Sequence, residues 1–333
     1  MAHIKALQLR LLNAAAVRDL LPMAKCIPLM RSAFEMVARG EAIQPIRQSV
    51  KHPDGRGLLG WMPGYTAHPE WLGVKVVSVF PGNFGTEFGS HQGMVLMFEP
   101  SHGAPVAMLD GREITAIRTA AATAAATDVL APAEVQTLGI MGYGEQAGSH
   151  IEALLHVRRF QRIMVWGRDL SKARRFAADM SATHSETEII AVDNALAAAS
   201  CDVVCTLTAA AEPILQARWL RPGQHLNIVG SSIPTTSEVD VETIARGRLF
   251  VDFKDSTLAL AGDFRRAKDS GLVTDQHIVG CVGDVLVGSV PARVAASDIT
   301  LFKSLGMSSE DLVACDYVLT ESIRRGIGQV VDW

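Results

Sequence analysis

Cysteine is scarce in this sequence, and its spacing excludes the common cysteine chemistries. The chain has 5 cysteines among 333 residues. Their number is odd, their positions are scattered, and they form no CxxC pair and have no nearby histidine at metal-ligand spacing. The pattern argues against a disulfide framework and predicts no metal site, so we expect reduced, structural thiols. These are Cys26, Cys201, Cys205, Cys281 and Cys315.

Charge is also sparse and nearly balanced. Charged residues make up 20% of the chain, with 31 basic and 35 acidic side chains and a formal net charge of -4. This balance offers no broad attraction for nucleic acid or for an anionic membrane surface, which favours a small-molecule partner. No apolar run reaches the roughly 18 residues of a spanning helix, and residues 1–5 lack the apolar segment of a signal peptide. The sequence therefore predicts a cytoplasmic protein.

Hydrophobic residues, in contrast, make up 48% of the chain, which is enough for a large core. A length of 333 residues favours two domains. Residues 11–40 carry apolar side chains at helical spacing, but Pro22 and Pro28 would interrupt a single helix, so we expect one or two shorter ones. Residues 44–109 hold short apolar segments between Gly-containing turns, which predicts an antiparallel sheet.

A different rhythm follows an Ala-rich helix that we expect over residues 113–129. Pro132 comes soon after and marks a plausible boundary. Beyond it, strands alternate with helices, which predicts βαβ units and a parallel sheet of Rossmann type. A final amphipathic helix, about 308–326, is expected to return to the first domain. The sequence thus predicts an α/β protein with one domain of residues 1–128 with 307–333 and a Rossmann domain of residues 129–306.

A glycine-rich turn gives the first functional signal. Alone the pattern is weak, but here it follows an apolar strand, residues 138–141, and precedes an amphipathic helix that runs through Leu155. Glycine lets the backbone approach a pyrophosphate, while the helix N-terminus directs its N–H groups and positive dipole end at the charge. We therefore predict dinucleotide binding rather than an ordinary tight turn. The turn is Gly142, Tyr143, Gly144, Glu145, Gln146 and Ala147.

The end of the second strand bears on which dinucleotide is bound. An NAD site usually has an acid near Gly167 to accept from the ribose 2′-hydroxyl, whereas a neutral residue followed by Arg168 suits a 2′-phosphate. The sequence favours NADP(H), with NAD(H) possible. The alternative is that Arg168 is a solvated residue and Asp169 only a helix N-cap. Thr206 and Thr208, at the end of the fourth strand, are further candidates for cofactor contact, although strand propensity alone explains threonine there.

Five motifs occur in order along the chain: Pro45-Ile46-Arg47, Gly73-Val74-Lys75-Val76-Val77, Ala116-Ile117-Arg118-Thr119-Ala120-Ala121, the Gly142 turn and Phe302-Lys303-Ser304-Leu305-Gly306. Together they resemble the ornithine cyclodeaminase/mu-crystallin family over most of the chain. The resemblance implies a homodimer whose N-terminal domain supplies the dimer sheet, with a Rossmann domain in the middle. The last matching motif adds Gly306 to the residues expected at the cofactor.

The resemblance also implies three basic residues that hold a substrate carboxylate, at Arg47, Lys75 and Arg118. Two of them point to an anionic partner independently of the resemblance. Arg118 lies in a helix of small, apolar residues and Lys75 in a strand of valines, where an unpaired charge is costly to bury. The alternative is that these charges are exposed or pair with carboxylates such as Glu113 or Glu99.

One departure separates the sequence from ornithine cyclodeaminases. Those enzymes carry an aspartate soon after the glycine that follows the strand at 225–229, and that carboxylate handles the substrate's amino groups. This chain has Ser232 there, and a neutral hydroxyl cannot act as a carboxylate base. Ser232 and a similar Trp-x-Arg after the second strand favour the ketimine reductase branch. Ser231 is as readily explained by backbone hydrogen bonding as by contact with the cofactor.

The resulting hypothesis is NAD(P)H-dependent reduction of the C=N bond of a small imine carboxylate such as Δ1-pyrroline-2-carboxylate. The cations would position the carboxylate, and the proton for nitrogen would come from water, Lys75 or solution acid. His91, expected in a turn, is a secondary proton-transfer candidate. Three alternatives remain. They are an ornithine cyclodeaminase with Asp284 or Asp263 as substitute carboxylate, an NAD(P)-dependent amino-acid dehydrogenase, and a non-catalytic NADPH or ligand binder.

Overall fold

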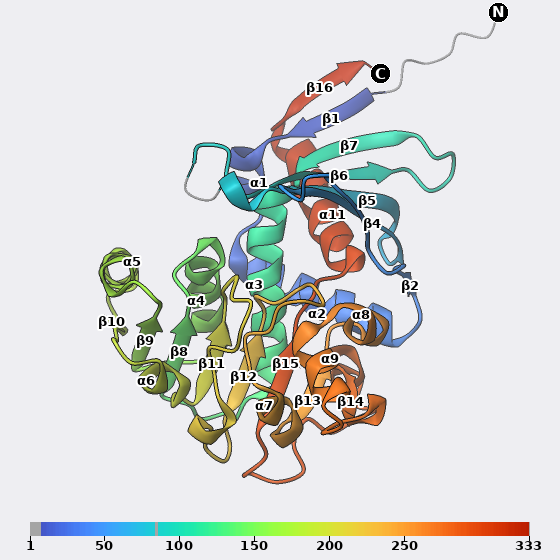
Figure 1. Cartoon of the computed structure of the whole chain (residues 1–333). Helices are drawn as coiled ribbons and strands as arrows, with labels where there is room; N and C mark the ends of the chain where they lie inside the picture. The colour runs from blue at the N-terminus through green and yellow to red at the C-terminus, as the bar shows by residue number, and fades with distance from the viewer. Residues whose placement is uncertain (1–7, 84–85, 333) are drawn as a thin grey trace, which may run out of the picture. The chain divides into compact units, whose positions relative to one another are not determined.

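The computed structural model describes residues 8–83 and 86–332, and the chain divides into two compact units (Figure 1). Unit 1 is Met1–Thr119 with Met307–Trp333, and unit 2 is Ala120–Gly306. The first division falls inside helix α3 (Gly111–Leu130), whereas the sequence predicts it at residues 128/129, near the end of that helix. Each unit has its own sheet. Within the described residues no helix is long and apolar enough to cross a membrane.

Unit 1 is built on a mostly antiparallel sheet, as predicted for residues 44–109. Its order is β16-β1-β7-β6-β5-β4-β2, and β3 also pairs with β4. Strands β1 and β16 were not predicted; they pair antiparallel with each other, and β1 lies parallel to β7. The strands are β1 (Gln8–Leu12), β2 (Ala42–Ile43), β3 (Gln48–Lys51), β4 (Leu58–Ala67), β5 (Glu70–Val79), β6 (His91–Phe98), β7 (Pro105–Asp110) and β16 (Gln329–Asp332), with a 3-10 turn η1 (Pro81–Asn83).

Helices cover one face of this sheet, which we call the inner face. Pro22 separates α1 (Ala14–Leu20) from α2 (Met23–Ala38), as predicted, whereas Pro28 lies inside α2. The C-terminal helix α11 (Ser308–Arg325) lies against β4 and β5. Two glycines permit this close approach, because a Cβ at Gly64 or Gly73 would lie less than 3.0 Å from Ser308 or Leu312. The first turn of α11 is thereby fixed against the middle of the sheet.

Unit 2 contains the predicted parallel sheet, in the order β10-β9-β8-β11-β12-β15-β13-β14. All its strand pairs are parallel. The strand order reverses between β8 and β11, and ligands of such sheets bind at this switch point, beyond the carboxyl ends of the strands. The strands are β8 (Thr137–Met141), β9 (Arg162–Trp166), β10 (Glu188–Ala191), β11 (Val203–Thr206), β12 (His225–Ile228), β13 (Arg248–Val251), β14 (Ile278–Cys281) and β15 (Thr300–Lys303).

The helices of unit 2 connect these strands and enclose an apolar core. All five cysteines of the chain are free, as expected; Cys201 precedes β11, Cys205 lies within it, and both are buried. The helices are α4 (Glu145–Val157), α5 (Leu170–Thr183), α6 (Ala195–Ala199), α7 (Val241–Arg246), α8 (Lys254–Leu260), α9 (Gly262–Asp269) and α10 (Val282–Leu286), with short turns η2 (Ala217–Trp219) and η3 (Asp275–His277).

Candidate active site

The glycine-rich turn lies at the switch point of the parallel sheet. β8 ends at Met141, Gly142 has a φ of 129°, and α4 begins at Glu145 with Gly144 as its N-cap. A Cβ at Gly142 would lie 2.6 Å from the carbonyl oxygen of Leu207, and nothing lies within 4 Å of a Cβ at Gly144. The backbone is therefore tight on one side of the turn and open on the other. An open helix N-terminus at this place suits a pyrophosphate.

Two further residues of the turn have distinct environments. Ala147 is fully buried, which is the close helix-to-strand packing that the motif requires. The side-chain oxygen Oε1 of Gln146 is buried and has no hydrogen-bond partner within the described part of the chain. A buried acceptor without a donor is costly, so Gln146 is suited to accept from a ligand group at the turn.

At the end of β9, Arg168 is exposed and Asp169 caps α5. The Asp169 carboxylate accepts from the backbone N–H groups of Ser171 at 2.9 Å and Lys172 at 3.1 Å. The N-cap interpretation of Asp169 is therefore correct. Asp169 is engaged by the helix, while Arg168 is directed to solvent.

A buried carboxylate that the sequence did not reveal joins the ends of β11 and β12. Glu238 accepts from the hydroxyl of Thr206 at 2.7 Å, from the hydroxyl and N–H of Thr208, and from the N–H of Gly230 at 2.7 Å. Burial raises the pKa of Glu238 above its ordinary value, against the opposing charge of Lys303. The hydroxyls of Thr206 and Thr208 thus donate to this buried carboxylate and hold the ends of the loops in place.

The two serines after β12 differ in environment. Ser231 is buried and its hydroxyl donates to the carbonyl oxygen of Thr236 at 2.7 Å, which is the backbone role considered for it. Ser232 is half-buried. Gly306 has a φ of 81°, and its N–H donates to Asp252 at 2.6 Å. These residues follow β12 and β15, which are adjacent strands of the sheet.

In unit 1, Lys75 and Arg118 belong to a buried ionic cluster. Lys75 Nζ lies 2.8 Å from Asp311 Oδ2, Arg118 Nε lies 2.9 Å from Asp311 Oδ1, and Arg118 Nη1 lies 2.7 Å from Glu310 Oε2. All four side chains are no more than 5% exposed. Both acids are in the first turn of α11, where the helix dipole stabilises negative charge. The partners are not Glu113 or Glu99, because Glu113 pairs with Arg18 and Glu99 accepts from Ser101.

Arg47 lies just before β3, and its charge acts on Lys75 of this cluster. It directly precedes Gln48, which pairs with Trp61, so the register places Arg47 beside Met62, the cross-strand partner of Lys75. Burial lowers the pKa of Lys75 to about 8, with further lowering by the charges of Arg118 and Arg47 and an opposing effect of Asp311. Three cations and two carboxylates leave one positive charge. The arrangement suits a single bound carboxylate.

His91 lies outside the cluster. It is exposed and is the first residue of β6, not part of a turn, and its Nδ1 lies 2.9 Å from Ser90 Oγ. Its cross-strand partner is Val79, four residues along β5 from Lys75. At about 3.3 Å per residue, that separation is about 13 Å. The turn predicted for His91 is wrong, because the β5–β6 pairing extends to it.

The comparisons with known proteins decide the family. A sequence profile of the ornithine cyclodeaminase/mu-crystallin family matches residues 8–326. The chain belongs to this family. The ketimine reductase mu-crystallin of Mus musculus is 37% identical over 312 residues, covering 92% of this chain and 95% of the relative. A Delta(1)-pyrroline-2-carboxylate reductase of Bacillus cereus is 29% identical over 323 residues, covering 97% and 99%.

A solved structure agrees with this membership of the ornithine cyclodeaminase/mu-crystallin family. The Delta(1)-pyrroline-2-carboxylate reductase of Thermococcus litoralis, in complex with NADH and L-proline, matches with a TM-score of 0.93 at 32% identity. The match covers 96% of this chain and 99% of that one. The predicted family and fold class are therefore confirmed.

The two acids considered as substitutes in a cyclodeaminase of this family are engaged elsewhere. Asp263 forms an ion pair with Lys303 at 3.0 Å and accepts from the Glu238 N–H at 2.7 Å. Burial opposes ionisation of Asp263, but Lys303 and these hydrogen bonds hold its pKa below its ordinary value. Asp284 accepts from the N–H of Cys281 at the start of α10. Neither carboxylate is available to replace the aspartate that ornithine cyclodeaminases have at the position of Ser232.

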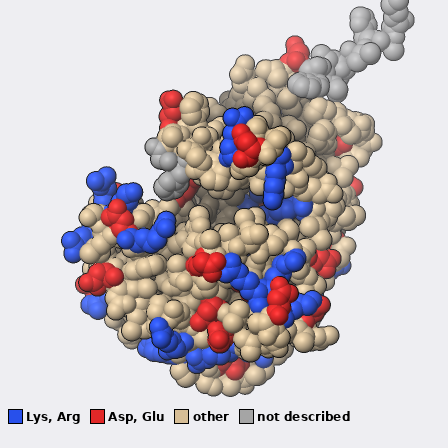
Figure 2. Space-filling model, in the orientation of Figure 1, with Lys and Arg blue, Asp and Glu red and all other residues tan. Residues whose placement is uncertain are grey.

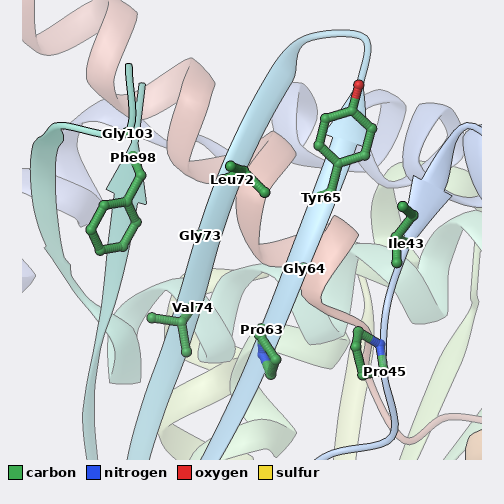
Figure 3. Close-up of a pocket in the computed structure, with 10 residues that line it drawn as sticks. All are labelled: Ile43, Pro45, Pro63, Gly64, Tyr65, Leu72, Gly73, Val74, Phe98 and Gly103. Carbon is green, nitrogen blue, oxygen red and sulfur yellow. The ribbon is translucent and has the colours of Figure 1, made fainter. Parts of the chain in front are cut away.

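The face of the unit 1 sheet opposite the inner face, here the outer face, has an apolar groove of about 470 Å³ (Figure 3). Ile43, Tyr65 and Leu72 line it, and they are cross-strand neighbours on β2, β4 and β5. Met62, by alternation along β4, lies on the inner face with Lys75. Met62 is thus on the face of the ionic cluster, whereas Tyr65 is on the other face.

Proposed function

We propose that this protein reduces the C=N bond of a small imine carboxylate, such as Δ1-pyrroline-2-carboxylate, with NAD(P)H. The observation that carries the proposal is the buried ionic cluster of Lys75, Arg118, Glu310 and Asp311, which with the nearby, half-buried Arg47 has one surplus positive charge to match one carboxylate. The glycine-rich turn supplies a dinucleotide site. The relatives named as ketimine and pyrroline-2-carboxylate reductases support the same chemistry.

The cations would bind and orient the substrate carboxylate. Arg47, Lys75 and Arg118 hold it, while Asp311 and Glu310 fix the directions of the Lys75 and Arg118 side chains. When bound, the reduced nicotinamide supplies the hydride that the imine carbon accepts. The imine nitrogen must gain a proton, so that C=N becomes CH–NH. Lys75, with a pKa of about 8, is protonated at neutral pH, and it is the donor that we propose among Lys75, water and solution acid.

The cluster's role is tested with a matched pair of imines. Oxidation of NADPH and NADH is followed by absorbance with Δ1-pyrroline-2-carboxylate and with Δ1-pyrroline, which lacks the carboxylate. The proposal expects kcat/KM to fall at least 100-fold without the carboxylate, since the three cations then lose their ligand. Δ1-Piperideine-2-carboxylate tests the ring size. Equal rates with and without the carboxylate would contradict the clamp, and no imine-dependent oxidation would favour an amino-acid dehydrogenase or a binding protein.

We infer that NADP(H) is the preferred cofactor. Arg168 is exposed at the end of β9, and Lys and Arg gather over α5 in Figure 2, where Lys172, Arg174 and Arg175 are exposed. A guanidinium there suits a 2′-phosphate. Arg168→Ala is expected to weaken NADPH binding about tenfold and to leave NADH binding within twofold. Equal losses for both dinucleotides would contradict a 2′-phosphate contact.

We also propose a homodimer through the outer face of the unit 1 sheet. Five large apolar side chains on this face are at least 41% exposed and are connected by cross-strand pairing: Ile43, Val50, Leu59, Leu72 and Met94. An exposed apolar face of this kind, with its groove, is typical of a surface that a second copy covers. Light scattering should give twice the chain mass, and Leu72→Lys should give monomers. Leu196→Lys, at a similarly exposed leucine of unit 2, is the matched control.

A further inference from the structure

Gly167 stands where a dinucleotide-binding sheet ordinarily carries an acid. β9 ends at Trp166, and the residue after this second strand commonly accepts from the ribose 2′-hydroxyl of NAD. Gly167 is not among the glycines with a positive φ, so its backbone conformation does not require glycine. The absence of a side chain at this position needs another physical reason.

The ring of Tyr143 supplies that reason. The N–H of Gly142 donates to the carbonyl oxygen of Trp166 at 2.8 Å, which attaches the glycine-rich turn to the end of β9. A Cβ at Gly167 would lie less than 3.0 Å from Cδ1 and Cε1 of the Tyr143 ring. The ring therefore fills the space into which any side chain at position 167 would project. Tyr143 and a carboxylate at 167 exclude each other unless the ring moves.

The surrounding charges agree with this interpretation. The nearby carboxylate of Asp169 is held by the first turn of α5 through Ser171 and Lys172. Arg168 is exposed beside it. A 2′-phosphate would meet a guanidinium here, whereas a 2′-hydroxyl would find no carboxylate at position 167.

We propose that Tyr143 is a specificity-determining residue, whose ring keeps position 167 free of a side chain and so excludes the carboxylate that would select NAD(H). The inference rests on the proposed dinucleotide function and deepens it. Cofactor preference is then set jointly by the glycine-rich turn and the end of β9. A change at position 167 alone is insufficient to alter it.

The test measures dissociation constants of NADPH and NADH by calorimetry on the full chain, in four proteins: the wild type, Gly167→Asp, Tyr143→Ala and the double variant. The wild type is expected to bind NADPH at least tenfold more tightly than NADH. Gly167→Asp should weaken the binding of both dinucleotides, because the Tyr143 ring and the new carboxylate compete for the same space. The double variant should bind NADH at least tenfold more tightly than Gly167→Asp does. Tyr143→Phe combined with Gly167→Asp keeps the ring and should behave as Gly167→Asp.

A second double-mutant cycle places alanine at position 167 and so adds no charge. It tests the same inference if the Gly167→Asp variant folds poorly. Gly167→Ala should weaken NADPH binding at least fivefold when it is introduced into the wild type. The same substitution should weaken NADPH binding less than twofold when it is introduced into the Tyr143→Ala variant. The inference would be overturned if Gly167→Asp alone bound NADH as tightly as the double variant does. It would also be overturned if Gly167→Ala weakened NADPH binding equally with and without the Tyr143 ring. Failure of the wild type to bind either dinucleotide would overturn the proposed function and this inference together. Dinucleotide binding without imine reduction would overturn only the reductase, since the two cycles still decide the role of Tyr143.

Discussion

At the scale of single residues, Lys75 has the environment most directly tied to chemistry. Its ammonium is buried, and burial, together with Arg118 and Arg47, lowers its pKa to about 8 while Asp311 opposes the change. The side chain is therefore charged below pH 8 and loses its charge as the pH rises through that value. Both roles proposed for it, carboxylate binding and proton donation, need the charged form.

Activity is accordingly expected to fall on the alkaline side. In a pH profile of kcat/KM for Δ1-pyrroline-2-carboxylate reduction, we expect a decline centred near pH 8. Lys75→Arg should move this decline to higher pH, whatever its effect on the maximum, because a guanidinium stays protonated. The same alkaline decline in both proteins would assign it to another group.

Asp311 connects two of the cations, so its replacement has two separable consequences. Asp311→Asn leaves Lys75 and Arg118 with less countercharge, and breaking such a buried pair costs about 3–5 kcal/mol of unfolding free energy. Because Asp311 raises the pKa of Lys75, the alkaline decline should also move to lower pH. Urea denaturation and the pH profile measure the two effects.

The matched control for this variant lies on the same helix. Asp316 is half-buried and accepts from the indole N–H of Trp71, which an asparagine oxygen can also do. Asp316→Asn should leave the alkaline decline in place. A shift of equal size in the two variants would show that the effect is a general consequence of altering α11.

At the scale of elements, the close packing of α11 on the sheet decides where the acids of the cluster stand. Gly73→Ala would place a Cβ against Leu312 and 2.7 Å from the carbonyl oxygen of Leu96. We expect a loss of about 1–3 kcal/mol in unfolding free energy and a raised KM for the imine, as the first turn of α11 is displaced. Gly148→Ala, whose Cβ would have an ordinary 3.6 Å contact with Met180, is the control and should not raise KM. An unchanged KM in Gly73→Ala would contradict the importance of this packing.

Elements with a strong local pattern could be predicted from the sequence, and those defined by distant pairing could not. The separation of α1 from α2 follows from Pro22, and the parallel sheet from the alternation of strands and helices. β1 and β16 were missed because each is short and gains its hydrogen bonds from the opposite end of the chain. Helices α8 to α10 are likewise too short to show a clear period.

The candidate site was predictable to a similar degree. Arg47, Lys75 and Arg118 came from the family resemblance, and the cost of burying two charges pointed to partners without naming them. Glu310 and Asp311 look like ordinary first-turn acids of a helix, and their burial depends on where α11 packs. Glu238 gave no local signal at all, because it lies in a loop and acts on residues far from it in sequence.

At the scale of the whole molecule, two buried histidines of unit 2 predict sensitivity to acid. Burial lowers the pKa of His150 from 6.5 to about 4 and that of His225 from 6.5 to about 3. Their contribution is fully present above pH 6.5 and is lost as the pH falls through the folded-state values, because the unfolded chain binds protons first. Each pH unit in this window costs up to about 1.4 kcal/mol per histidine.

Thermal unfolding between pH 7 and pH 4 tests this expectation. His150→Gln removes one titrating group and should reduce the dependence of the melting temperature on pH. His156→Gln, on the exposed side of α4, is the control. An equal dependence in all three proteins would show that other groups dominate the acid response.

Net reduction of an imine and deamination of an amino acid differ in the stoichiometry of their products. The wild-type protein is incubated with Δ1-pyrroline-2-carboxylate and NADPH, and separately with ornithine and NAD+, while proline, ammonia and both cofactor forms are measured. We expect one proline for each NADPH oxidised in the first mixture, and no ammonia in the second. Proline and ammonia from ornithine with no net change in the cofactor would contradict the proposed imine reduction.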